Sequence, residues 1–270
     1  SRGASGRTGG TRGYREPAML KRSLMILSVL LAQPSPSLSA TNSSPGRGRS
    51  VLEAGQDLAK LAEGLDSTKP RVRHGAVDAL ADVGTLEAWT LVLDRGLSDL
   101  NSRVADSAQL RLGEAPATPA LLELLESRSG LGSRKAICRV RVAQALGAMP
   151  GEVPARLFER ALKDKGPQVR SALAAAVEQR SGSGAASISG GASDMKRLLK
   201  ALDKVATRDR DSRTRAAGVL ALAAFSTAQG VGEEEAAGAI SDALSSDDPL
   251  LISAAVYAAA ERLSTDELEG

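Results

Sequence analysis

The sequence predicts an all-α protein, namely an α-solenoid (superhelix) of about six helix pairs. The first observation behind this prediction is a hydrophobic pattern that returns after 32, 34 and 31 residues, at Val72, Val104, Cys138 and Val169. The second is composition, since aromatic residues make up only 2% of the chain and leave no bulky core for a β-sandwich. The third is that no stretch of useful length alternates apolar and polar residues as a half-buried strand does. A period in the thirties made of helix pairs is typical of an α-solenoid.

The pattern is clearest in the stretch DSTKPRVRHGAVDALADVG. Its residues Val72, Ala76 and Leu80 lie four apart and therefore share one face of a helix. Pro70 suits the first helical turn, where its missing N–H breaks no hydrogen bond, and Gly84 suits the end of the helix. One such helix cannot bury its apolar face alone, so the sequence predicts neighbours of the same kind.

Later copies supply those neighbours by keeping the same face apolar. Each copy is preceded by a further helix, which we predict to be its packing partner. The predicted repeat core is Val72, Ala76, Leu80, Val104, Ala108, Leu112, Val142, Leu146, Val169 and Leu173.

The ends of several helices carry their own signals. Thr118 precedes Pro119 as a cap does, and Glu233 opens a run of three acids that the helix dipole favours at an N-terminus. The predicted pairs are 51–65 with 69–83, 86–97 with 101–112, 117–127 with 133–147, 154–164 with 167–179, 194–207 with 212–227, and 233–245 with 249–263.

These helices divide into two blocks. Repeats one to four occupy residues 51–180, and repeats five and six occupy 194–264, followed by a short tail at 265–270. The Gly/Ser-rich segment 181–193 separates the blocks and predicts a flexible stretch. It is either a surface loop within a continuous stack or a hinge. We favour the loop, because two repeats are fewer than the three or so that stand alone.

Residues 1–40 read as a leader. Met19 begins a positively charged stretch, then a nine-residue apolar segment, then small residues up to Ala40, which is the layout of a secretory signal peptide. The apolar segment is too short to span a bilayer, and no transmembrane segment is predicted in the mature chain. We expect a secreted or periplasmic protein; the alternative is an organellar transit peptide, because arginines and serines are frequent upstream of Met19. Residues 41–50 form a polar linker.

The leader also explains the net charge of +3. Residues 1–40 contain six basic residues and one acid, so the remainder of the chain carries −2. The basic isoelectric point is therefore no argument for nucleic acid, which we regard as an unlikely partner.

The search for chemistry gives no catalytic residue, metal site or cofactor site. The single histidine, His74, lacks other ligands at metal spacing. Cys138 replaces a repeat valine and is expected to pack as a small hydrophobe. Trp89 is expected to pack between helices.

The phrase P-x-V-R-x-x-A-x-x-A-L resembles the HEAT repeat, especially the short form named after phycobilisome lyases. The resemblance implies the solenoid fold but many unrelated roles. HEAT-repeat proteins include the deoxyhypusine hydroxylases, which bind iron through His-Glu pairs on successive repeats. This sequence contains no His-Glu pair, which separates it from those enzymes. The matching residues are Pro70, Val72, Arg73, Ala76, Ala79, Leu80, Pro167, Val169, Arg170, Asp247, Asp248 and Pro249, with the arginine also kept at 139 and 215.

Basic residues are concentrated between 134 and 215, a stretch that contains 18 basic and 8 acidic residues. Residues 233–270, by contrast, contain one basic and ten acidic residues. The repeat arginines explain part of this excess, if they pair with aspartates of neighbouring turns. Eight others lie in first helices, where the repeat asks for no arginine. They are either solvated helix faces, the simpler interpretation, or a surface for an acidic partner. We call this set the basic arc: Arg156, Arg160, Lys163, Lys165, Lys196, Arg197, Lys200 and Lys204.

Two functions fit the sequence. The first is a monomeric, non-catalytic scaffold that binds another protein. The second is an enzyme or enzyme subunit on the same repeats, either similar to a bilin lyase subunit or acting on nucleic acid through the basic arc. The chain could also be the repeat segment of a larger protein.

Overall fold

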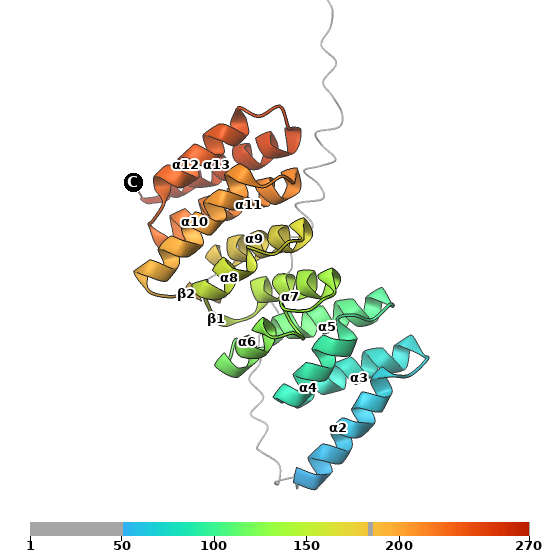
Figure 1. Cartoon of the computed structure of the whole chain (residues 1–270). Helices are drawn as coiled ribbons and strands as arrows, with labels where there is room; N and C mark the ends of the chain where they lie inside the picture. The colour runs from blue at the N-terminus through green and yellow to red at the C-terminus, as the bar shows by residue number, and fades with distance from the viewer. Residues whose placement is uncertain (1–50, 183–185, 270) are drawn as a thin grey trace, which may run out of the picture. The chain divides into compact units, whose positions relative to one another are not determined.

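The computed structural model describes residues 51–182 and 186–269, which belong to one compact unit (Figure 1). The leader and linker predicted for 1–50 lie outside these residues. The described part is mostly helical, as predicted. Its helices are α2 (Val51–Leu65), α3 (Pro70–Val83), α4 (Leu86–Leu91), α5 (Ser102–Glu114), α6 (Pro119–Glu126), α7 (Ala136–Ala148), α8 (Ala155–Ala161), α9 (Pro167–Ser181), α10 (Ala192–Arg208), α11 (Ser212–Gln229), α12 (Glu233–Leu244) and α13 (Pro249–Glu269), with a π-helical turn, η1 (Val92–Gly96), continuing α4.

These helices form a two-layered stack. The second helices of the pairs make one layer, in which α3, α5, α7, α9, α11 and α13 each pack on the next. The first helices make the other layer, where α4 contacts α6, and α10 contacts both α8 and α12. This arrangement is the predicted α-solenoid, and the colours of Figure 1 follow it from α2 to α13. No helix in the described part is long and apolar enough to cross a bilayer.

Helix ends follow the local signals in the sequence. Pro70 and Pro119 stand at the first positions of α3 and α6, and the Thr118 hydroxyl accepts a hydrogen bond from the Leu121 N–H at 3.3 Å. Gly84 ends α3 with φ +68°, a left-handed conformation that glycine adopts without strain. Glu233 opens α12, as predicted.

The predicted repeat core is buried at every position except Val72. Val72 is 45% exposed, whereas Val104 and Val169, which hold the same place in later repeats, are 1% exposed. The prediction is wrong for Val72 because the part of the chain that the structure describes has no helix pair before α2 and α3 to bury this side chain.

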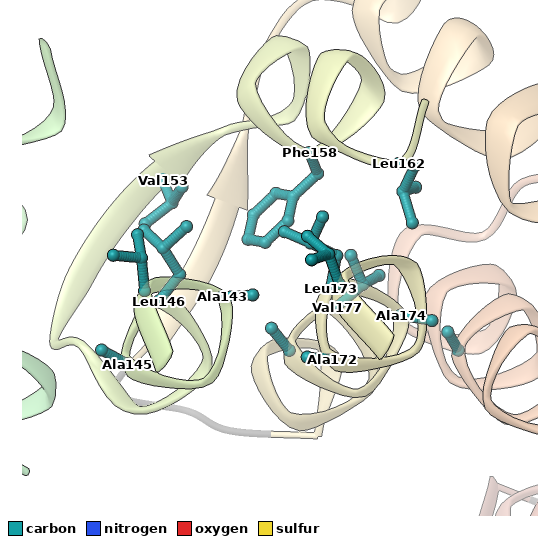
Figure 2. Close-up of a cluster of buried hydrophobic side chains, with 14 of the residues drawn as sticks. Ala143, Ala145, Leu146, Val153, Phe158, Leu162, Ala172, Leu173, Ala174 and Val177 are labelled. Atoms are coloured by element: carbon teal, nitrogen blue, oxygen red, sulfur yellow. The ribbon is translucent and has the colours of Figure 1, made fainter. Parts of the chain in front are cut away.

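One cluster of the core lies where α8 covers α7 and α9. Figure 2 shows the Phe158 ring pointing between the two helices, with Leu146 and Val153 on one side and Leu173 and Val177 on the other. All five side chains are 1% exposed or less. A single aromatic ring thus closes a gap that the small side chains of the second helices leave open.

Two short strands correct the prediction of a sheet-free stack. β1 (Gly151–Pro154) and β2 (Ala186–Ser189) pair in parallel, with Val153 opposite Ile188. Each strand directly precedes the first helix of its pair, α8 or α10, so two consecutive repeats bring equivalent segments side by side. Each strand has only four residues, which is too few to show an alternation of apolar and polar residues. The strands could therefore not be predicted from the sequence pattern.

The segment 181–193 is therefore not a purely flexible stretch, because it contains β2 and the start of α10. The helices on its two sides pack on each other, α9 on α11 and α8 on α10, as expected for a loop within a continuous stack. At the C-terminal end the predicted tail is also corrected, since α13 runs on to Glu269.

Candidate functional site

Three of the four repeat arginines form ion pairs that hold successive helix pairs together. Each guanidinium binds both carboxylate oxygens of an aspartate in the turn of the next pair, and donates a further hydrogen bond to a carbonyl in its own turn. This two-pronged geometry suits arginine and joins successive pairs. The pairs are Arg73 with Asp99 at 2.6 Å, Arg139 with Asp164 at 2.7 Å and Arg170 with Asp209 at 2.6 Å.

The turn aspartate also shapes its own turn. Asp99 Oδ1 accepts a hydrogen bond from the Asn101 N–H at 2.8 Å. The hydrogen bond from Arg73, the Asn101 N–H and the charge of Arg73 together hold the pKa of Asp99 below its usual value. The carboxylate therefore serves two turns at once.

We call this series of arginine–aspartate connections between successive pairs the ladder. One of its connections is incomplete. Arg215 occupies the repeat position of α11, but the turn before α13 has Ser246 where the turns before α5, α9 and α11 have Asp99, Asp164 and Asp209. Ser246 Oγ still accepts from the Asp248 N–H at 3.1 Å. The buried Nε of Arg215 has no hydrogen-bond partner in the described part.

The basic arc lies on neighbouring helices of the first layer. Arg156 and Arg160 belong to α8, Lys163 and Lys165 follow in the turn after it, and the other four residues belong to α10, which packs beside α8. All eight side chains are exposed. The structure thus brings the two predicted groups together.

Ion pairs occupy three members of the arc. Arg160 contacts Glu126 at 3.3 Å, Lys163 pairs with Glu159, and Arg197 pairs with Asp194. Five members have no ion pair or hydrogen bond from the side chain within 51–182 and 186–269. They are Arg156, Lys165, Lys196, Lys200 and Lys204.

The fields of the two helices overlap. The pKa of Glu159 in α8 is lowered first by its hydrogen bond from Lys163, and also by Arg197 of α10. The pKa of Asp194 in α10 is lowered first by its hydrogen bond from Arg197, and also by Arg156 of α8. The two helices therefore present one positive field rather than two separate ones.

A hollow of about 700 Å³ borders the arc, between α6, β1 and α8. Arg156 and Arg160 line it together with Glu123, Glu126 and Glu152, and Arg160 contacts Glu126. Acidic residues of α6 and β1 therefore lie next to the basic residues of α8.

An arginine that the sequence analysis did not single out ties the centre of the stack together. Arg180 is 1% exposed and donates five hydrogen bonds to four backbone carbonyls. Two acceptors, Leu146 O at 2.8 Å and Met149 O at 2.7 Å, lie at and just after the end of α7. The other two, Gly151 O and Ser187 O, belong to β1 and β2. Burial lowers the pKa of Arg180 to about 10.

The residues with possible chemistry have structural surroundings. Cys138 is buried, and Trp89 packs in the core, as predicted. His74 Nδ1 lies 3.1 Å from Asp78 Oδ2 on the half-exposed surface of α3. Within the described ranges, no three His, Cys, Asp or Glu side chains gather as metal ligands do.

A second feature that the sequence analysis missed is a cavity of about 200 Å³ between α9, α11 and α13. Its polar lining includes Glu178 and Ser181 from the end of α9, and Tyr257, Glu261 and Arg262 from α13. No sequence signal joins these residues, because the two helices are separated by α10, α11 and α12.

Comparisons with known proteins leave the chain unassigned. No family model matches it, and no curated protein matches it. Among solved structures it is similar to two engineered proteins from the Northeast Structural Genomics Consortium, each with 19% identity and a TM-score of 0.43, over 75% of this chain and 94% or 96% of theirs. It is also similar to human deoxyhypusine hydroxylase in complex with glycerol, with 19% identity and a TM-score of 0.39, over 76% of this chain and 73% of that one. Likeness at this level carries no argument about function.

Proposed function

We propose that this protein is a monomeric, non-catalytic scaffold of HEAT type that binds an acidic segment of a partner protein across α8 and α10. The observation that carries the proposal is the set of five exposed basic side chains without an ion pair, on two helices packed side by side. Fold requirements do not explain them, since the repeat arginines already join the pairs.

The HEAT assignment is supported by the repeat phrase and by the pairs it makes. Arg73, Arg139 and Arg170 each reach the turn of the following pair. The arginine that marks the repeat in the sequence is thus also the residue that connects one helix pair to the next.

A protein partner fits the face better than nucleic acid does. Single-stranded nucleic acid is held by aromatic side chains on which bases stack. Phe158, the aromatic residue of α8, is fully buried, and α10 contains no aromatic residue. An acidic peptide needs only the positive field of the basic arc.

The test reverses Arg156, Arg160, Lys163 and Lys165 to glutamate and measures binding to partners captured from the native compartment. Exposed charges contribute little to stability, so the variant should fold. Association should slow, and added salt should erase the difference, because salt screens such attraction beyond about 8 Å at physiological strength.

A matched control reverses four exposed basic residues of the other layer and its turns, Arg71, Arg103, Arg134 and Lys135. It changes the net charge equally and should leave binding unchanged. Equal loss in both variants would show a net-charge effect, and unchanged binding in the first variant would refute the assignment. Binding of nucleic acid that falls steeply with salt, with no protein partner, would favour the alternative function.

We further propose that the scaffold is exported. A fusion of residues 19–45 to a reporter should leave the cytosol and lose its leader near Ala40. An uncleaved reporter retained in the cytosol would contradict this proposal, and import into an organelle would favour a transit peptide.

A further inference from the structure

We infer that the cavity between α9, α11 and α13 binds a small organic amine, whose ammonium group is held by Glu178. This site is separate from the basic arc, because the arc belongs to the first helices of the pairs and the cavity to the second. The inference therefore stands or falls independently of the scaffold proposal.

The shape of the cavity fits a small ligand with a short apolar body. Its volume is about 200 Å³, and its apolar lining comes from α11 and α13, including Leu220, Ala223, Ala224 and Ala258. A concave apolar surface with a few convergent polar groups is the usual form of a small-molecule site.

Glu178 supplies the charge that selects a cation. Its carboxylate has no hydrogen bond or ion pair within the described residues, although burial desolvates it. A carboxylate removed from water without a partner is costly, and a cation in the cavity would remove that cost. Burial, together with the charge of Glu261, raises the pKa of Glu178 to about 7.

The opposite wall comes from α13 and adds to the negative field. Glu261 Oε1 accepts a hydrogen bond from the Tyr257 hydroxyl at 2.7 Å, which fixes the position of the carboxylate. The same hydrogen bond is the first cause that raises the pKa of Tyr257 to about 12, so the phenol stays neutral. Two carboxylates from different helices thus line a single small space.

A second, independent observation that points to a ligand concerns two polar atoms in the lining residues. Ser181 Oγ and Arg262 Nη1 are both shielded from solvent and have no hydrogen-bond partner among the described residues. Buried polar atoms normally have partners. A hydroxyl or carboxyl oxygen on the ligand would satisfy either atom, so the site accepts amines that carry an oxygen.

The charged form of Glu178 makes binding depend on pH. The titratable groups that face the cavity are Glu178 from α9 and Tyr257, Glu261 and Arg262 from α13, whereas α11 contributes none. Near pH 8 Glu178 is mostly ionised and attracts an ammonium group. At pH 5.5 it is mostly protonated, so affinity should fall while the amine itself stays charged.

The experiment titrates the full chain with three probes that share one body, namely butylamine, 1-butanol and butyrate. Binding is followed by NMR at pH 8 and pH 5.5. Butylamine should shift signals of α9, α11 and α13 at pH 8, more weakly at pH 5.5, and the alcohol and acid should not. Glu178→Gln should abolish the shifts, and Glu152→Gln, which removes an exposed carboxylate of β1, should leave them unchanged.

Three results would overturn the inference. Butyrate binding better than butylamine would make Arg262, not Glu178, the selecting group. Equal binding of all three probes would reduce the site to an apolar pocket. If butylamine shifted no NMR signal of residues around the cavity in the native protein, the cavity would not be an amine site. Thermal unfolding of both variants checks that any loss is not a loss of fold.

Discussion

Replacing Arg180 with methionine is the most direct test of how the centre of this stack is held. The guanidinium binds carbonyls at and just after the end of α7 and in both strands, so one side chain connects three elements. Methionine fills most of the volume but donates no hydrogen bond. The change therefore removes the donors without opening a large cavity.

The magnitude follows from the four acceptors. The carbonyls of Leu146 and Met149 are buried and would lose their Arg180 donor, at about 1–3 kcal/mol each. The carbonyls of Gly151 and Ser187 are only partly buried and can bind water instead. Methionine also avoids the cost of burying a charge, which offsets part of the loss. We expect a net decrease of about 2–4 kcal/mol in the free energy of unfolding.

The assay is urea unfolding followed by circular dichroism, together with hydrogen exchange of the strand amides. Exchange should accelerate in β1 and β2 first, because both strands lose their common donor. Arg156→Met, at an exposed arginine of the adjacent helix, is the control and should change stability by less than about 0.5 kcal/mol. An Arg180→Met protein as stable as the native one would show that burying the charge costs as much as its hydrogen bonds return, and would refute the reasoning.

Other predictions concern pH, the ladder and the core. Because the folded state raises the pKa of Glu178 to about 7, the native protein should lose up to about 2 kcal/mol of stability as pH rises from 4.5 to 7, and Glu178→Gln should flatten that slope in urea unfolding curves. Ser246→Asp should add about 1 kcal/mol by giving Arg215 a carboxylate, and Arg215→Ala should cancel the gain in a double-mutant cycle. Leu80→Ala should cost about 2–5 kcal/mol, whereas Val72→Ala should cost less than about 1, and equal losses by thermal unfolding would contradict the exposure of Val72.

The period and the apolar face predicted most of the fold, because both are local signals. Pro119 and Thr118 begin α6 through contacts within one turn of the chain, and Leu112 or Leu146 is buried wherever an α-helix places it against a neighbour. Such requirements repeat in every pair, so each copy supports the prediction for the others.

The errors arise where a residue depends on distant partners. Val72 and Val104 hold the same place in their repeats, but no described helix pair precedes the one that contains Val72. β1 and β2 exist because consecutive repeats bring them together and Arg180 binds a carbonyl of each. The cavity at Glu178 needs α13 to approach α9 across α11, and spacing along the chain contains no trace of that approach.

The ladder separates the charges that the fold needs from those it does not. Where a pair has arginine at the repeat position, the next turn has aspartate in three cases of four. The second pair has Ala105 at that position, and the turn that follows it has Ser133. The Ser133 hydroxyl accepts a hydrogen bond from the Lys135 N–H at 3.4 Å. The turn can therefore form with either residue, and aspartate is present to receive the arginine. Five members of the basic arc, namely Arg156, Lys165, Lys196, Lys200 and Lys204, have no acidic partner in the part of the chain that the structure describes. Their excess is consequently a property of the surface, and a partner with negative charge is the explanation that the scaffold proposal puts to the test.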